Sequence, residues 1–297
     1  MIYYARRRRS HSYNKLFFLI LLAALVTLFI LRGPIESRIN DAGQPTRPTT
    51  QPIETQFAVV DQIKKIINSQ SGTYAIYFYD LSTNSSWGIN EKTVITAASV
   101  AKLPILAALY YQAEKKQADL DDLVTVQSGD LQEGTGMLQS GQIYSVKTLA
   151  RLMMEKSDNT AGHLLAVYLG VDNVQKLVDE WGLRQTVMAD NQTSPYDMAK
   201  LLTKIYRAEI AGQALTDEMM GFMDDSDFED RLPALLPKDV KVYHKIGTEV
   251  NSIHDVGIIN LAQRPYILGV FTHGISDEAQ TVSTIAKISQ IVFDYQK

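Results

Sequence analysis

Strand patterns occur near both ends of this chain, and a long block of helical patterns separates the two groups. The strand-like segments combine alternation, or runs of β-branched and aromatic residues, with turn residues at their ends. They cover residues 72–80, 86–90, 241–248, 253–259 and 266–272. Early and late strands share one core only if they pair across the helical block, so this order predicts one antiparallel sheet of five strands.

Helical patterns flank and separate these strands. Amphipathic helices are predicted at the two ends of the domain, over residues 53–68 and 277–294. The intervening block contains helical segments at residues 99–115, 144–155, 158–169 and 171–181, and one after Ser194-Pro195, where an N-cap serine precedes proline at N1. We therefore expect an α+β domain with terminal helices on one face of the sheet, an all-helical lobe on the other, and a cleft between the lobes.

Composition limits the classes of function. The 297 residues, 45% of them hydrophobic, can bury one large core or two modest ones, and a net charge of -4 argues against nucleic-acid binding. The absence of cysteine excludes disulfides, thiolate metal sites, a cysteine nucleophile and a lipid-modified cysteine. The five histidines show no ligand spacing, so we expect neither a metal nor another cofactor.

The N-terminal region has the pattern of a membrane anchor. A basic segment, residues 1–15, precedes sixteen apolar or near-apolar residues at 16–31, which make about 24 Å of helix. The excess of positive charge before the span predicts a single-pass protein of the cell membrane, with residues 1–15 cytoplasmic and the rest outside. Leu31-Arg32-Gly33-Pro34 lacks a small-x-small pattern, which favours an uncleaved signal-anchor over the alternative, a cleaved signal peptide. Residues 32–52 are a Pro/Thr-rich linker before the domain at 53–297.

Three short strings carry the chemistry. Ser99 and Lys102 lie at i and i+3 where a buried helix is predicted to start, so the amine can take the proton of the hydroxyl. Taken alone, this pair is equally a helix N-cap followed by a solvated lysine. However, Ser-Asp-Asn at 157–159 falls at a predicted helix start, and Lys-Ile-Gly-Thr at 245–248 on a predicted strand. The three strings in this order form a joint signal.

These strings resemble the Ser-x-x-Lys, Ser-Asp-Asn and Lys-Thr-Gly signature of class A β-lactamases and penicillin-binding proteins. The resemblance runs from about residue 53 to the end of the chain. It includes the segments 134–138, 149–154 and 193–199. The resemblance implies a β-lactamase/transpeptidase-like fold and an acyl-enzyme formed when Ser99 attacks the carbonyl of a β-lactam or a peptidoglycan stem peptide.

The resemblance also implies roles around Ser99. Lys102 would be the base, directly or through water, with its pKa depressed by about three units through burial and the nearby charge of Lys245. Ser157 would relay the proton to the leaving nitrogen, and Lys245 would attract the substrate carboxylate. Asn159 would hold Lys102 and the substrate amide.

Two further implied elements complete this site. The backbone N–H groups of Ser99 and Thr248, the latter following Gly247, would form the oxyanion hole. Asp158 would have a structural role. Ile246 departs from the family pattern, because a hydroxyl residue stands there in the family, and we expect its side chain to fill core.

The larger departure is a missing glutamate. Class A enzymes carry a long loop here whose glutamate activates the water that deacylates the enzyme. In this chain Gly182 and Pro195 are only thirteen positions apart, and the segment between them holds no glutamate. Asp190 is its only carboxylate, and it is either a substitute base or simply a turn residue.

The sequence therefore predicts a membrane-anchored, extracytoplasmic serine hydrolase of the class A β-lactamase type, acylated at Ser99 and slow to deacylate. Two alternatives stay open. One is a peptidoglycan D-Ala-D-Ala peptidase that uses the same residues. The other is a non-hydrolytic module that binds cell wall or antibiotic.

The predicted topology has a direct test. Protease added to intact cells should digest the domain after Arg32 and spare an N-terminal tag, because the positive charges hold residues 1–15 in the cytoplasm. Protection of the domain would contradict this topology. A mature N-terminus downstream of Leu31 would instead identify a cleaved signal peptide.

Overall fold

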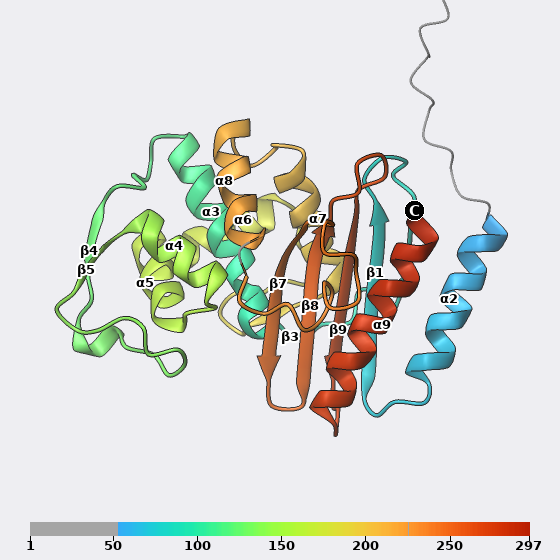
Figure 1. Ribbon diagram of the computed structural model, residues 1–297. Coiled ribbons are helices and arrows are strands. Elements are labelled where there is room, and N and C mark those ends of the chain that lie inside the picture. Colours follow the sequence, from blue (N-terminus) through green and yellow to red (C-terminus); the bar gives the residue numbers. More distant parts are fainter. Residues whose placement is uncertain (1–52, 225) are drawn as a thin grey trace, which may run out of the picture. The chain divides into compact units, whose positions relative to one another are not determined.

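The computed structural model describes residues 53–224 and 226–297, and its centre is a five-stranded antiparallel sheet (Figure 1). The strands lie in the order β2-β1-β9-β8-β7, so the two ends of the domain pair between β1 and β9. Their bounds are β1 Thr73–Asp80, β2 Ser86–Ile89, β7 Val242–Glu249, β8 Ser252–Ile259 and β9 Tyr266–His273. The predicted sheet is confirmed.

Alternation along the strands divides the core between the two faces of the sheet. On β9, Ile267 and Phe271 belong to the core beneath the helical lobe, whereas Leu268 and Val270 belong to the core beneath the terminal helices. This is the period-two pattern of a strand covered on both faces. Successive side chains on this strand therefore pack into different core clusters, one on each face of the sheet.

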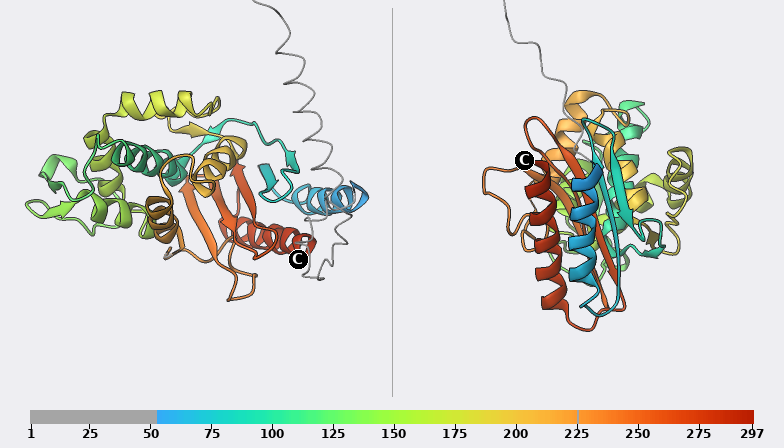
Figure 2. Two further views of the ribbon diagram at one scale, coloured as in Figure 1. Left: turned by 90° about the horizontal axis from the view of Figure 1, so that it is seen from above. Right: turned by 90° about the vertical axis from the view of Figure 1, so that its right-hand side faces the viewer.

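The two terminal helices cover one face of the sheet and the remaining helices lie on the other side, as predicted (Figure 2). The terminal helices are α2 Ile53–Ile67 and α9 Glu278–Gln296. The helical lobe contains α3 Lys102–Glu114, α4 Val146–Glu155, α5 Asn159–Leu169, α6 Val171–Glu180, α7 Pro195–Tyr206 and α8 Gln213–Asp224. Ser194 caps α7, since its side chain accepts a hydrogen bond from the Asp197 N–H.

Three features differ from the sequence expectations. Ser99 lies in a 3-10 turn, η1 Ala98–Ala101, which precedes α3, rather than in the first turn of an α-helix. Helix α8 was not predicted, because Thr216 and Gly221 dilute its apolar pattern. The lobe also contains a second 3-10 turn, η2 Ser128–Asp130, and four short strands: β3 Ile95–Thr96, β4 Leu123–Thr125, β5 Ile143–Ser145 and β6 Gln192–Thr193.

Within the residues that the structure describes, no helix has the length and apolarity needed to cross a membrane. The predicted cytoplasmic segment, anchor and linker, residues 1–52, lie outside the described residues.

Candidate active site

The turn that carries Ser99 packs closely against strand β7. Ala98, directly before Ser99, has a φ of 48°, a left-handed conformation that an alanine adopts only when its surroundings impose it. Strand β7 imposes part of this by close approach, because a Cβ on Gly247 would lie 2.9 Å from the Ala97 carbonyl oxygen and 3.1 Å from Val100. Only glycine at position 247 lets the strand lie this near the turn.

The amine of Lys102 lies at the centre of the predicted constellation. Its Nζ lies 3.0 Å from Ser99 Oγ, 2.6 Å from the carbonyl oxygen of Ser157, 3.2 Å from Ser157 Oγ and 2.7 Å from Asn159 Oδ1. The structure thus brings together four of the residues that the sequence singled out. All four acceptors are within hydrogen-bond distance of one nitrogen.

Burial lowers the pKa of Lys102 to about 8, while the negative charge of Asp158 opposes this shift. The sequence prediction named like-charge repulsion from Lys245 as the cause of this shift, together with burial. The structure gives burial as the main one. An amine with this pKa is neutral in part of the molecules at pH 7, and its lone pair can then accept the Ser99 proton.

The Ser157-Asp158-Asn159 segment forms the sharp start of α5. Ser157 has a φ of 53°, and the Asp158 side chain caps the helix by accepting from the Ala161 N–H at 2.7 Å. Asp158 also accepts from the hydroxyl of Thr135, which ties the 133–137 loop to the helix start. Asn159 Nδ2 donates to the carbonyl oxygen of Glu133 at 2.7 Å, so both ends of its amide are fixed.

Lys245 is placed differently from the expectation that it points into the open cleft. Its side chain is 1% exposed, and its Nζ has no hydrogen-bond partner among the described residues. The Phe228 ring centroid lies 5.9 Å from this nitrogen. Phe228 belongs to residues 226–232, which we call the strap. Burial lowers the pKa of Lys245 well below its usual value, and the nearby charge of Lys102 adds to this.

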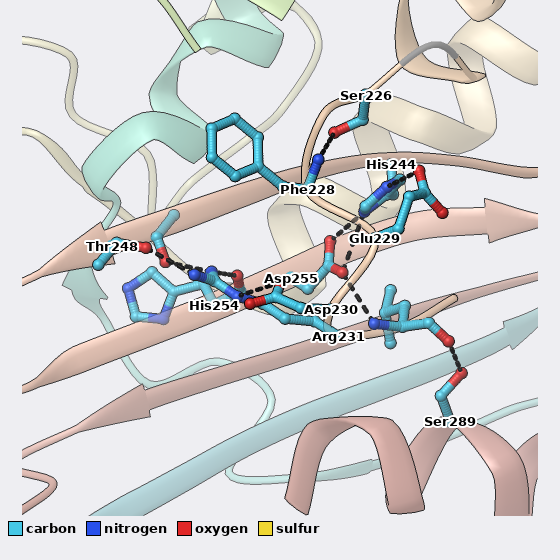
Figure 3. Close-up of polar contacts among 12 residues, drawn as sticks. Ser226, Phe228, Glu229, Asp230, Arg231, His244, Thr248, His254, Asp255 and Ser289 are labelled. Carbon is cyan, nitrogen blue, oxygen red and sulfur yellow. Dashed lines mark hydrogen bonds and ion pairs between the residues drawn. The ribbon is translucent and has the colours of Figure 1, made fainter. Parts of the chain in front are cut away.

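The strap is fastened to the edge of the sheet (Figure 3). Arg231 donates to the carbonyl oxygen of Gly247 at 2.9 Å and to Thr248 Oγ1 at 2.7 Å. Glu229 lies 3.5 Å from Nε2 of the buried His244, whose Nδ1 is 2.9 Å from Asp255. Burial opposes the charged form of His244, but the two carboxylates outweigh it and raise its pKa to about 9.

Beside Ser99 and Lys102 lies a cavity of about 350 Å³. Its other walls include Asn159 of α5, and Thr248 and Glu249 at the end of β7. Asn191 also lines it, from the segment between Gly182 and Pro195, which we call the short loop. The described residues contain no group of three or more histidine, cysteine, aspartate or glutamate side chains placed to hold a metal ion. The groups within hydrogen-bond distance of Lys102 Nζ are hydroxyl, amide and backbone oxygens.

Asp190, the candidate substitute base, is not brought into this cavity. It is exposed on the turn that precedes Gln192, and it is absent from the cavity lining. The next residue, Asn191, has a φ of 50° and lines the cavity instead. Its carbonyl oxygen accepts from the Ala97 N–H at 2.7 Å, which locks the short loop to the Ser99 turn.

Sequence reasoning missed three residues that hold this site together: Asn191, Arg231 and His254. His254 Nε2 lies 2.9 Å from the Thr96 carbonyl oxygen, at the end of β3, and its Nδ1 accepts from the Thr272 N–H. Burial lowers the pKa of His254 to about 4, so the ring is neutral at pH 7. No local motif marks these positions, because their partners are distant in the sequence.

The model of the family described as the Beta-lactamase enzyme family matches residues 58–296. The chain belongs to the beta-lactamase enzyme family. Ser99, Lys102 and the Ser157-Asp158-Asn159 segment all lie within the matched region, as do the strands that frame them.

Similar proteins include other members of this family and a related structure. A beta-lactamase of Proteus vulgaris is 24% identical over 80% of this chain and 86% of its own, and Beta-lactamase VEB-1 of Pseudomonas aeruginosa is 22% identical over 77% and 88%. Among solved structures, that of PBP-A has 26% sequence identity to this chain and a TM-score of 0.77. The match covers 84% of this chain and 98% of the PBP-A chain. A point mutant of PBP-A has been solved as an acyl-enzyme complex with penicillin G, with 25% identity, coverage of 80% and 96%, and a TM-score of 0.76.

The pKa of Lys102 gives a prediction for the rate of acylation at Ser99. We expect the rate constant to rise about tenfold per pH unit from pH 6 and to level off near pH 8, because only the neutral amine accepts a proton. Labelling with a β-lactam well below its saturating concentration measures this, because the second-order rate constant reports the pKa of the free enzyme. Lys102→Ala should lower the rate by about 10²- to 10⁴-fold and remove the inflection. A flat wild-type profile from pH 6 to 8 would contradict the assignment of Lys102 as the base.

The His244 contacts give a prediction for stability. The folded pKa of about 9 is above the unfolded value of 6.5, so the folded state binds the proton more tightly. The resulting stabilisation is complete below pH 6.5 and is lost as the pH rises through about 9, with a full extent of about 3 kcal/mol. Urea unfolding of the wild type and His244→Asn across this range measures the difference curve. Parallel curves for the two proteins would refute the role of His244.

Proposed function

We propose that this chain is a serine acyl-transfer enzyme of the class A β-lactamase type, and that β-lactams acylate Ser99 faster than water releases the product. The observation that supports this most is the 3.0 Å contact between Lys102 Nζ and Ser99 Oγ, at an amine whose pKa burial lowers to about 8. A neutral amine in this position converts a weak hydroxyl nucleophile into an effective one.

Acylation then proceeds in two steps. Lys102 accepts the proton of Ser99 as Oγ forms a bond to the substrate carbonyl carbon, and the carbonyl oxygen becomes an oxyanion stabilised by the Ser99 and Thr248 N–H groups. The carbon–nitrogen bond then breaks, and the leaving nitrogen receives a proton through the Ser157 hydroxyl. Ser157 Oγ lies 3.2 Å from Lys102 Nζ, so the proton taken from Ser99 can be returned along this contact.

Deacylation lacks an evident carboxylate base, and the one histidine of the described cavity lining, His163 of α5, is the remaining side chain there that could act as a base. Among the described residues lining the cavity, Glu249 is the only carboxylate, and it is exposed at the end of β7. A general base works well when it is fixed and shielded from bulk water. An exposed carboxylate beside a hairpin turn does not meet that requirement, and Asp190 lies outside the lining.

The cavity also suits a second candidate function, release of D-alanine from a peptidoglycan stem peptide. The missing carboxylate base favours it for a chemical reason. When a linear peptide acylates Ser99, the D-alanine departs and leaves space for water or an amine. In a β-lactam the broken bond belongs to a ring, so the leaving nitrogen stays attached to the acyl group and fills that space.

We also propose that the domain lies outside the cytoplasmic membrane, anchored by residues 16–31 and separated from it by the 32–52 linker. The support is the charge asymmetry around the apolar segment. Both substrate classes, β-lactams and wall peptides, are found in that compartment.

Pre-steady-state kinetics test the proposed function. A chromogenic β-lactam should give a burst of about one equivalent followed by a slow steady rate, because acylation has its base and deacylation lacks a carboxylate base. Mass spectrometry should find one acyl adduct, and Ser99→Ala should abolish both adduct and burst while the thermal midpoint stays near wild type.

Matched variants separate the outcomes. Glu249→Gln and Asp190→Asn should leave the slow rate unchanged. Rapid sustained turnover that one of these variants abolishes would identify a deacylation base and contradict slow deacylation. D-alanine released from a pentapeptide would establish the peptidase. An unlabelled Ser99 together with no release of D-alanine would leave only the non-hydrolytic binding module.

A further inference from the structure

A second hollow, of about 230 Å³, lies where α7 crosses strand β1, and it shares no lining residue with the Ser99 cavity. Three half-buried tyrosines form part of its wall: Tyr77 and Tyr79 of β1, and Tyr196 of α7. Tyr77 and Tyr79 are two positions apart on the strand and so face the same side. The Tyr77 and Tyr196 rings meet edge to face, with centroids 5.1 Å apart.

Basic side chains line the other side of the hollow. Lys200, Lys204 and Arg207 are spaced by four and three residues, so they share one face of α7. Glu209 is the only carboxylate lining the hollow within the described part of the chain, and it pairs with Lys204 at 3.1 Å. Three cations and one carboxylate give a local charge of +2, in a chain whose net charge is -4.

These cations have hydrogen-bond donors to spare. Lys200 donates to the Gly182 carbonyl oxygen at 2.9 Å, and Arg207 donates through Nη2 to Asn84 Oδ1 at 2.6 Å and to Tyr79 OH at 3.3 Å. An ammonium has three N–H donors and a guanidinium five. Their contacts to the described residues therefore use only part of their capacity, and the rest is available to an anion.

The geometry selects the kind of ligand. Half-buried tyrosine rings in the wall of a concave site favour a ring-shaped ligand with an apolar face, and the cations favour an acidic group on that ring. The edge-to-face arrangement of Tyr77 and Tyr196 leaves no parallel pair of rings to sandwich a nucleobase. A volume of about 230 Å³ suits a single sugar ring.

We infer that this hollow binds an anionic sugar residue. The C–H face of the saccharide ring packs on Tyr196, and its carboxylate or phosphate pairs with Lys200, Lys204 and Arg207. The Arg207 guanidinium already lies over the Tyr79 ring, 5.9 Å from its centroid, so it is held at the edge of the hollow. Lys92, whose Nζ is 5.0 Å from the Tyr196 ring centroid, adds positive charge beside the same ring. This binding site does not depend on chemistry at Ser99, so sugar binding and the proposed enzyme activity can be tested independently.

Binding of three related sugars to the full chain tests this inference. N-acetylmuramic acid carries a carboxylate, N-acetylglucosamine is the same ring without it, and N-acetylglucosamine 6-phosphate carries a phosphate. Titration by ligand-observed saturation-transfer NMR should show saturable binding of the anionic sugars, with Kd on the order of 1 mM. The neutral sugar should bind at least tenfold more weakly. The tighter of the two anions identifies the acidic group, and hence the source of the natural ligand.

Variants of single residues locate the binding. Tyr196→Ala should weaken binding of the anionic sugars about tenfold, whereas Tyr196→Phe should retain it because the ring remains. Lys204→Gln should weaken binding and reduce its salt dependence, and Lys287→Gln, an exposed lysine on α9, is the matched control. Equal binding of all three sugars, absence of saturable binding, or insensitivity to Tyr196→Ala in a folded variant would overturn the inference.

Discussion

The buried amine of Lys102 is the constraint on which the rest of the site depends. An amine removed from water needs hydrogen-bond partners, because a buried unpaired polar group costs several kcal/mol. Its four acceptors come from the Ser99 turn and from Ser157 and Asn159 at the start of α5, which are distant from that turn in the sequence. Their convergence requires the left-handed φ of Ser157, the Asp158 cap and the anchored amide of Asn159. Of these, the left-handed φ of Ser157 is a local cost that satisfying this one nitrogen helps to offset.

Strand β7, at the edge of the sheet, makes the other half of the site. The buried amine there lacks, among the described residues, the hydrogen-bond acceptors that surround Lys102. Lys245 is buried like Lys102, but its Nζ has no hydrogen-bond partner in the described part of the chain. Burial and the charge of Lys102 disfavour the protonated form of Lys245, so an anion that reaches this amine favours its protonation and supplies the missing counter-charge. In the proposed function the substrate carboxylate supplies that charge. The strap places Phe228 over Lys245 and is held to the sheet by Arg231 and Glu229.

Local sequence patterns were enough to predict the five-stranded sheet and the group of Ser99, Lys102, Ser157 and Asn159. Alternation located the five main strands, and the Ser194-Pro195 pair located the start of α7, because both signals act over a few residues. The position of Asn191 could not be read in this way. It results from a turn with positive φ and from a backbone bond to Ala97, 94 positions away. The strap was missed for the same reason, since Arg231 acquires its role only from strands that fold against it.

The short loop between Gly182 and Pro195 offers a physical reason for the slow deacylation that we propose. Its backbone is bonded to the Ser99 turn, so the loop cannot move away without disturbing the nucleophile. Yet the residue that it presents to the cavity is an amide. The buried Oδ1 of Asn191 has no hydrogen-bond partner among the described residues, and it can accept a bond from a water beside the ester. An amide oxygen cannot take a proton from that water at neutral pH. In the proposed function, a water at this position is held without being activated, so the acyl-enzyme persists.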